Sequence, residues 1–426
     1  SVQSRLFTVC AYISTPFVWN VIFVRGSLGE LMAYALFPWV LHVFGIVYKP
    51  AKNHVPVIVA AVVYSTFLLS HNVSAVIGSF ALILWLLFAF SFHKAAVIKW
   101  LVAGVLGIAL ASWFWIPALL ESSETVVFQA SNNTEAIRHL ISLPQAIAGP
   151  LGFGYSFAGT PDSMSFAISP LLWLGILLAI VHMTLPLLSA KSRLSPMPRY
   201  FMTAIVQFVA TILLQLDLSK IIWQALPQLS ILQFPWRLAL FSTIFALPIL
   251  HWMYVQSTTG LKVVWVTVLV LTLISSLSAL PNRMITRPDI YYETFAETTS
   301  TQHENMPKSF RYLDISDWKN EPSILSGDAV ISNVVWSGSA RSYDIDVRTN
   351  SVVIEPTARF IGWETTLIDR SEQSGGPLTY IDSETIAGRI AYELNVGTYT
   401  VTTRFTEKTL ARVTGNSVTL LAALVI

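Results

Sequence analysis

The stretch that decides the fold is Leu232-Gln233-Phe234-Pro235-Trp236-Arg237, which ends a polar-flanked loop and opens into an apolar run reaching about Tyr254. Pro235 suits the first turn of a helix, because the N–H that proline lacks would be unpaired there anyway. Arg237 stands at the edge of this helix, where a charge is costly unless it reaches an interface or meets an anion. Two interpretations remain open. Trp236 and Arg237 anchor the helix at a membrane interface, or Arg237 and free helix N–H groups hold a phosphate.

The composition around this stretch is that of a membrane protein. Mean hydropathy is +0.61, and only 12% of the residues are charged, whereas soluble proteins carry about 25%. Residues 1–281 hold 13 Lys and Arg against 6 Asp and Glu, and residues 282–426 hold 13 against 18. A basic apolar part and an acidic polar part indicate a membrane domain with an extracytoplasmic domain. No basic face is clustered, so we expect no nucleic-acid partner.

Apolar windows long enough to cross a bilayer predict a polytopic α-helical membrane protein with about nine spans. The windows are 6–24, 30–48, 55–70, 75–92, 95–119, 169–189, 201–217, 237–256 and 262–280. We expect residues 1–281 to form this transmembrane domain, with a long outer loop at 121–168. Within it, Trp113-Phe114-Trp115-Ile116-Pro117 predicts an aromatic belt followed by a helix stop at the proline.

The positive-inside rule orients these spans. With the N-terminus inside, nine Lys and Arg residues fall on the cytoplasmic side and four on the outer side before residue 282. The four outer residues are Arg25, Arg138, Lys220 and Arg237. For a bacterium, the expected location is then the inner (cytoplasmic) membrane, with the C-terminal domain periplasmic or extracellular.

The hydrophobic period changes after a polar connector at 282–326. Six segments alternate or are β-branched: 329–336, 340–347, 351–355, 362–368, 386–394 and 398–405. They predict an antiparallel β-sandwich within a domain of residues 282–415. Gly415-Asn416-Ser417 is interpreted as a turn and N-cap, so that 416–426 begins a further, truncated membrane helix of a longer chain. The single Cys10 excludes an intrachain disulfide and a zinc cluster of cysteines.

The candidate site residues lie in the expected outer loops. They are Arg25, Glu30, His71, Asn72, Asp162, Gln233, Trp236 and Arg237. Two arginines on one side of a membrane suit a phosphate or pyrophosphate, because guanidinium binds such oxygens in bidentate fashion. Glu30 is a candidate base toward a hydroxyl acceptor. In the alternative interpretation, Arg25 and Glu30 pair with each other and only fix the helix ends.

The histidines inside the apolar windows do not have ligand spacing. His42, His182 and His251 are far apart in sequence, and such residues more often bond a neighbouring polar group than a metal. We therefore expect no metal site. The loops of one face also provide no Ser-His-Asp or Cys-His arrangement.

Four short motifs resemble a bacterial membrane-protein family. They are Val24–Glu30, Leu69–Asn72, Ala111–Leu119 and Leu232–Arg237, and Phe360-Ile361-Gly362-Trp363 with Asn395–Tyr399 follows in the same order. These motifs resemble the family called 6-pyruvoyl-tetrahydropterin-synthase-related, which is similar to YfhO-type proteins and to the glycosyltransferase C superfamily. That superfamily uses lipid-phosphate-linked sugars. Its catalytic acid commonly lies in a first outer loop, after a span that this chain does not contain.

The resemblance implies a protein that binds a polyprenyl-phosphate-linked sugar at the outer face and transfers it to an extracytoplasmic acceptor. The expected donor is this lipid-linked sugar, with no other cofactor, and the expected partners are membrane lipids and subunits of a membrane complex. In this hypothesis Arg25, Asn72, Asp162, Gln233, Trp236 and Arg237 bind substrate, and Glu30 and His71 are the catalytic candidates. Two alternatives stay open: a non-catalytic scaffold subunit and a transporter of lipid-linked glycans.

Overall fold

The computed structural model divides the chain into two compact units, which we describe separately. The helical unit comprises residues 1–111, 131–285 and 422–426, and the β unit comprises 112–130 and 286–421. The structure describes the whole chain except 51–52, 127–132, 150–151, 155, 158–162, 189–197, 278–279, 282–284, 294–305, 310–320, 370–374, 378–379 and 382–385. Asp162 therefore lies outside the described residues.

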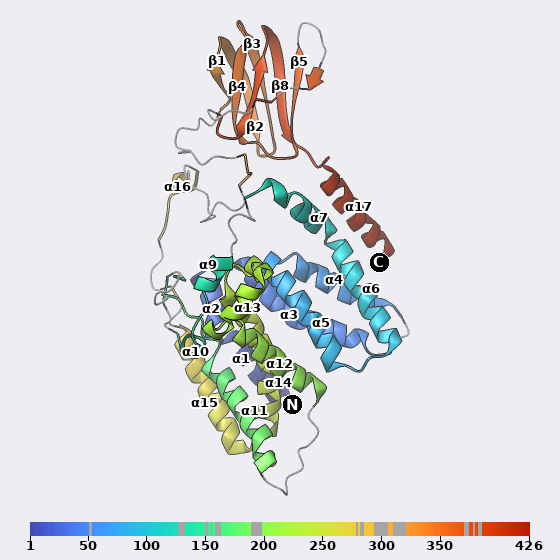
Figure 1. Ribbon diagram of the computed structural model, residues 1–426, viewed down its shortest axis with the longest axis vertical. Coiled ribbons are helices and arrows are strands. Elements are labelled where there is room, and N and C mark those ends of the chain that lie inside the picture. Colours follow the sequence, from blue (N-terminus) through green and yellow to red (C-terminus); the bar gives the residue numbers. More distant parts are fainter. Residues whose placement is uncertain are drawn as a thin grey trace. The chain divides into compact units, whose positions relative to one another are not determined.

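The helical unit is organised around the helix that follows the Pro235 motif. Its elements are α1 (Val2–Ile13), α2 (Pro16–Phe23), α3 (Leu28–Val47), α4 (Val55–Leu68), α5 (Asn72–Ala89), α6 (Lys94–Leu110), α9 (Asn133–Arg138), α10 (Leu143–Ile147), α11 (Pro170–Leu188), α12 (Arg199–Leu213), η2 (Asp217–Ser219), α13 (Lys220–Ala225), η3 (Pro227–Leu232), η4 (Pro235–Leu238), α14 (Ala239–Gln256) and α15 (Thr259–Ser276) (Figure 1). The span formed by η4 and α14 has 78% of its apolar window buried, against 17% for α15. α14 is thus the central helix, with α1, α11 and α12 packed on it.

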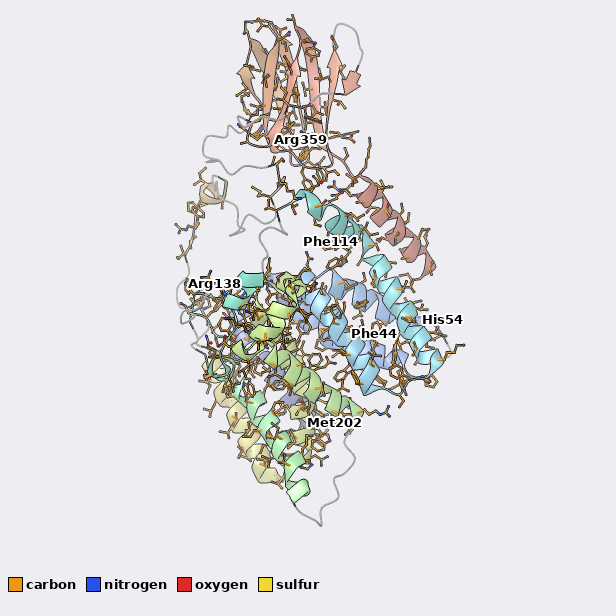
Figure 2. The ribbon with its side chains drawn as sticks, viewed as in Figure 1. Phe44, His54, Phe114, Arg138, Met202 and Arg359 are labelled. Atoms are coloured by element: carbon orange, nitrogen blue, oxygen red, sulfur yellow. The ribbon has the colours of Figure 1, made fainter. Side chains whose placement is uncertain are left out.

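All nine apolar windows fall on helices. Four helices are long and apolar enough to cross a membrane, and up to six spans result if each of two bent helix pairs counts as one, among the residues that the structure describes. The shorter apolar helices are Val55–Leu68, Pro170–Thr184, Arg199–Leu213 and Leu410–Val425. These helices are consistent with a membrane protein. The number of nine spans remains a prediction. Figure 2 shows the buried Phe44 within the helical unit and the exposed His54 at its edge.

The predicted helix stop at Pro117 is wrong. The helical run that begins with α6 is interrupted at Ala111, and Pro117 lies inside α7 (Ser112–Leu120). Only five residues of α7 precede this proline, so a single intrahelical hydrogen bond is lost close to the start of the helix. The break therefore falls before the aromatic residues instead of after them.

The β unit contains two antiparallel sheets. One has the order β1-β4-β7 and the other the order β2-β3-β8-β5-β6. The strands are β1 (Ser323–Ser326), β2 (Ala329–Ser337), β3 (Ala340–Val347), β4 (Ser351–Ala358), β5 (Trp363–Asp369), β6 (Gly375–Pro377), β7 (Arg389–Leu394) and β8 (Gly397–Phe405), and Figure 1 shows them as the orange arrows. A shared core joins the two sheets, with Tyr343 and Ile345 of one facing Val353 and Tyr392 of the other.

The predicted strands match this unit closely, because alternation is strong where one strand face is buried. Segment 340–347 coincides with β3, and the other five predicted segments overlap β2, β4, β5, β7 and β8. β1 and β6 were not predicted, since four and three residues are too few to display a period. The unit also contains η1 (Ser122–Glu124) and α16 (Asp289–Glu293).

The interpretation of Gly415-Asn416-Ser417 as a turn and N-cap is wrong. α17 runs from Leu410 to Val425 and passes through all three residues. Its first turn is held by Thr409, whose side chain accepts the Arg412 N–H at 3.3 Å. A Cβ at Gly415 would lie 2.7 Å from the Ser112 carbonyl oxygen, so this glycine serves the close approach of α17 to α7.

Candidate functional site

Four candidate residues from distant parts of the chain meet in the helical unit. Arg25 lies in the turn between α2 and α3, and Glu30 in the first turn of α3. His71 is the N-cap of α5, and Arg237 lies in η4. Three helical elements therefore begin at this cluster, and the sequence alone could not show that their starts converge.

Glu30 is the centre of the cluster, with a side chain that is 1% exposed. Arg25 Nη2 donates to Glu30 Oε1 at 2.9 Å, and Arg25 Nη1 donates to Oε2 in a second, short bond. Nε of Arg237 lies 3.1 Å from Glu30 Oε1. The predicted pairing of Arg25 with Glu30 is thus confirmed, and it includes a second arginine that the alternative interpretation did not foresee.

Gln233 positions the second arginine. Arg237 Nη1 donates to Gln233 Oε1 at 2.8 Å and to the Leu232 carbonyl at 3.0 Å. Gln233 itself has a φ of 59°, in the left-handed region that residues with a side chain rarely adopt. The turn directs the Gln233 side-chain amide toward Arg237. We interpret the strained backbone at Gln233 as the conformation that this contact requires.

The rings of Phe234 and Trp236 lie beside the two guanidinium groups, and we call this pair of rings the aromatic wall. Arg25 lies over the Trp236 ring at 4.6 Å, and Arg237 over the Phe234 ring at 5.1 Å. The two rings stack with their centroids 5.0 Å apart. Trp236 is only 2% exposed, so the interpretation of it as an interfacial anchor is wrong. Its ring is fixed inside the protein and holds Arg25 by a cation–π contact.

His71 completes the cluster as a neutral group. Its Nδ1 accepts the Ser74 N–H at 3.2 Å, which leaves the hydrogen of the neutral ring on Nε2. Nε2 lies 3.8 Å from Glu30 Oε1. Burial lowers the pKa of His71 to about 4, and the two arginines add to this effect, although Glu30 opposes it. His71 is therefore uncharged at neutral pH, and the four side chains together carry one positive charge.

The turn that carries His71 is packed tightly against α3. A Cβ at Gly29 would lie 2.7 Å from the Ser70 carbonyl oxygen and 3.5 Å from the His71 ring. Because a backbone oxygen cannot move aside like a side chain, Gly29 fixes the distance between the start of α3 and the start of α5.

Ser156 and His139, which were not among the candidate residues, support the aromatic wall. Trp236 Nε1 donates to Ser156 Oγ at 3.2 Å, and Ser156 Oγ lies 2.8 Å from His139 Nδ1. The His139 ring meets Phe234 edge to face. Ser156 and His139 both belong to the segment 121–168, which the sequence predicted as a long outer loop.

The remaining candidates are less closely connected. Asn72 is the first residue of α5 and is exposed, and no contact joins it to Glu30. Two of the histidines inside the apolar windows contact neighbouring side chains: His251 Nδ1 lies 2.8 Å from Thr8 Oγ1, and the His182 ring packs edge to face on Trp252. Among the described residues no group of three or more His, Cys, Asp or Glu could hold a metal ion.

Comparison with known proteins identifies no relative. No protein-family model, no curated protein and no solved structure matches this chain.

Proposed function

We propose that this chain is a glycosyltransferase-C-like membrane protein whose arginine cluster binds the phosphate of a polyprenyl-phosphate-linked sugar. The observation that carries the proposal is the convergence of Arg25 and Arg237 on the single carboxylate of Glu30. The contact with Glu30 holds the two guanidinium groups close to each other, as binding of one phosphate by both would require. Guanidinium is the side chain best suited to phosphate oxygens.

The position of the cluster at helix ends supports a lipid headgroup as the source of that anion. α3, α5 and the span formed by η4 and α14 are three of the four candidate membrane spans, and all three begin at the cluster. A helix N-terminus presents unpaired N–H groups and a partial positive charge. The cluster would then lie at headgroup depth, with apolar helix surface below it for the polyprenyl chain.

The geometry also supports distinct roles for Glu30 and His71. Both oxygens of Glu30 already contact guanidinium groups, which favours a role in holding the arginines over proton transfer to an acceptor. His71, neutral with Nε2–H directed into the cluster, is suited to orient an acceptor hydroxyl or a phosphate oxygen. In transfer of the sugar, Arg25 and Arg237 would stabilise the charge that develops on the departing phosphate.

In this proposal the protein spans the inner membrane about nine times, and the cluster and the β unit both face the outer side. The positive-inside count supports the orientation, since nine Lys and Arg residues fall on one side and four on the other. The sugar acceptor would then be an extracytoplasmic glycan or protein.

The test is binding and transfer with the full chain in lipid nanodiscs. We expect polyprenyl phosphate to bind the wild-type chain, and Arg237→Ala and Arg25→Ala each to weaken that binding by about tenfold or more, as expected for losing a charge-assisted hydrogen bond. The matched control is Arg199→Ala, because Arg199 is exposed and donates to Ser91 in another part of the unit.

Transfer of sugar from the polyprenyl-phosphate donor should fall with the same variants. Equal lipid binding by wild type, Arg237→Ala and Arg199→Ala would remove the role of the cluster and leave the scaffold alternative. Binding that depends on Arg237 without any sugar transfer would favour the transporter.

A further inference from the structure

The β unit contains a pocket that the arginine cluster does not account for. Its volume is about 590 Å³, within the range of roughly 300–1,000 Å³ that small-molecule sites occupy. The pocket is lined by the aromatic residues Phe360, Trp363 and Tyr380, by the oppositely charged Arg359 and Glu124, and by the apolar Ile390.

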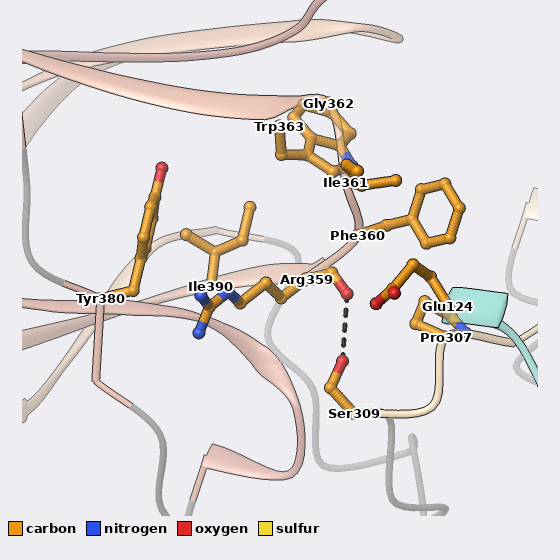
Figure 3. Close-up of a pocket in the computed structure, with 10 residues that line it drawn as sticks. All are labelled: Glu124, Pro307, Ser309, Arg359, Phe360, Ile361, Gly362, Trp363, Tyr380 and Ile390. Carbon is orange, nitrogen blue, oxygen red and sulfur yellow. Dashed lines mark hydrogen bonds between the residues drawn. The ribbon is translucent and has the colours of Figure 1, made fainter. Parts of the chain in front are cut away.

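The pocket is built by a sharp turn between β4 and β5. Gly362 has a φ of +104°, a conformation that favours glycine, and a Cβ there would lie 2.6 Å from Arg412 Nη1. The turn brings Arg359 and Trp363 to the same hollow (Figure 3). Two hydrogen bonds hold residues 308 and 309 at the edge of the pocket. Ser309 Oγ donates to the Arg359 carbonyl at 3.1 Å, and the Lys308 N–H donates to the Glu124 carbonyl at 2.8 Å.

The two charges in the pocket have no ion-pair partner within the part of the chain that the structure describes. Arg359 is exposed and lies over the Tyr380 ring at 5.0 Å, and Glu124 is exposed as well. Figure 3 shows the Arg359 side chain extending toward Tyr380 and Ile390, with Glu124 on the other side. Tyr380 is held in place because its hydroxyl accepts the Thr365 N–H at 3.0 Å.

From these features we infer that the pocket binds a neutral saccharide. Arg359 and Glu124 carry opposite charges, so the pocket as a whole favours neither an anionic nor a cationic ligand, while a purely apolar ligand would desolvate both charges without replacing their hydrogen bonds to water. Hydroxyl groups both donate and accept, so one sugar satisfies a guanidinium and a carboxylate together. The C–H face of a sugar ring would pack against the partly exposed rings of Phe360 and Trp363, which line the pocket.

This inference is independent of the proposed lipid-phosphate site, because the pocket shares no residue with the arginine cluster. The experiment uses the full chain in nanodiscs and three neutral disaccharides, namely maltose, cellobiose and lactose, with saturation-transfer NMR as the readout. We expect transfer from protein aromatic protons to sugar C–H protons for at least one of them. Arg359→Ala and Glu124→Gln should each lower the affinity about tenfold.

Two matched controls make the test specific. Arg348→Ala removes an exposed arginine of the same unit, paired at 3.7 Å with Asp328 and outside the pocket, and should leave sugar binding unchanged. Arg237→Ala should also leave it unchanged, which separates this pocket from the proposed function. The inference is overturned if no disaccharide shows transfer, if a disaccharide that contains glucuronate binds more tightly than the neutral ones, or if Arg348→Ala weakens binding as much as Arg359→Ala.

Discussion

The two units each bury a carboxylate beside arginine, and they do so in opposite ways. The Glu30 side chain is 1% exposed and meets Arg25 and Arg237, which remain 15% and 12% exposed. The Glu355 side chain is 0% exposed and pairs with one arginine among the described residues, Arg341, which is 2% exposed. The first cluster brings two partly exposed guanidinium groups to one carboxylate, whereas in the second one arginine pairs with one carboxylate and both side chains are buried. We call Glu355 with Arg341 the sealed cluster.

Hydroxyl groups complete the sealed cluster. Glu355 Oε1 accepts from Thr403 Oγ1 at 2.7 Å and from the Tyr343 hydroxyl at 3.0 Å, and its Oε2 lies 3.3 Å from Arg341 Nε. Burial raises the pKa of Glu355, although Arg341 acts against this, and burial lowers the pKa of Arg341. A cluster with its own counter-charge and its own hydroxyl donors serves the fold. A cluster with two partly exposed guanidinium groups is suited to a ligand.

The largest effect is expected in the sealed cluster. Glu355→Ala leaves the buried Arg341 charge without its partner and should lower the free energy of unfolding of the β unit by about 3–5 kcal/mol. Chemical denaturation followed by tryptophan fluorescence measures this change. The double variant Arg341→Met/Glu355→Leu should recover most of the loss, since no charge is then left unpaired. A loss below about 1 kcal/mol for the single variant would contradict a structural role.

The second prediction distinguishes the two clusters directly. Glu30→Gln leaves two guanidinium groups facing each other and should destabilise the helical unit by about 2–4 kcal/mol. Polyprenyl phosphate should restore the stability of this variant, because a bound anion replaces the lost carboxylate and stabilises by mass action. Thermal unfolding with and without the lipid measures the rescue. The same lipid should not rescue Glu355→Gln, and equal behaviour of the two variants would remove the distinction.

A smaller effect is expected at the packing of α3 against the His71 turn. Gly29→Ala places a Cβ 2.7 Å from the Ser70 carbonyl oxygen and should destabilise the helical unit by about 1–3 kcal/mol through overpacking. It should also weaken binding of polyprenyl phosphate. The control is Gly104→Ala in α6, where nothing lies within 4 Å of the added Cβ. That variant should be neutral or stabilising by about 0.5–1 kcal/mol.

The smallest effect is a difference in pH dependence. The folded pKa of His71 is about 4 against 6.5 for the free group, so its contribution is present above pH 6.5 and is lost as the pH falls toward 4. Glu355 has a folded pKa above 4.5, so its contribution is present below pH 4.5 and is lost as the pH rises through the folded pKa. As the pH rises from 4.5, the helical unit should therefore gain stability while the β unit loses it.

Hydrogen exchange, corrected for its intrinsic pH dependence, measures how the free energy of unfolding of each unit changes with pH. We call this change the slope of that unit. For His71 we expect a change of about 1 kcal/mol, because solvent screens a ring that is partly exposed. His71→Asn keeps an N-cap and should flatten only the slope of the helical unit, and Glu355→Gln should flatten only that of the β unit. Parallel slopes in the two units would contradict both assignments.

Much of the architecture could be predicted from local patterns. Apolar windows predicted the helices, and period-two alternation predicted β3 to the residue. Errors arose where one residue type has two uses. Gly415 was interpreted as a turn residue but permits close packing of α17 on α7, and Pro117 was interpreted as a helix stop but lies inside α7. Local sequence does not show which use applies, because the neighbour that requires the glycine is about 300 residues away.

By itself, the sequence determined the residue types of the candidate site and their places at helix starts, since capping, charge and hydropathy act over a few neighbouring residues. Only the tertiary structure decided that Arg25, Glu30, His71 and Arg237 meet, that Trp236 is buried and that Arg359 and Glu124 share a pocket. Ion pairs and cavities depend on distances between segments far apart in the chain. Packing of α3, α5 and α14 sets those distances in the helical unit, and the turn between β4 and β5 sets them in the β unit.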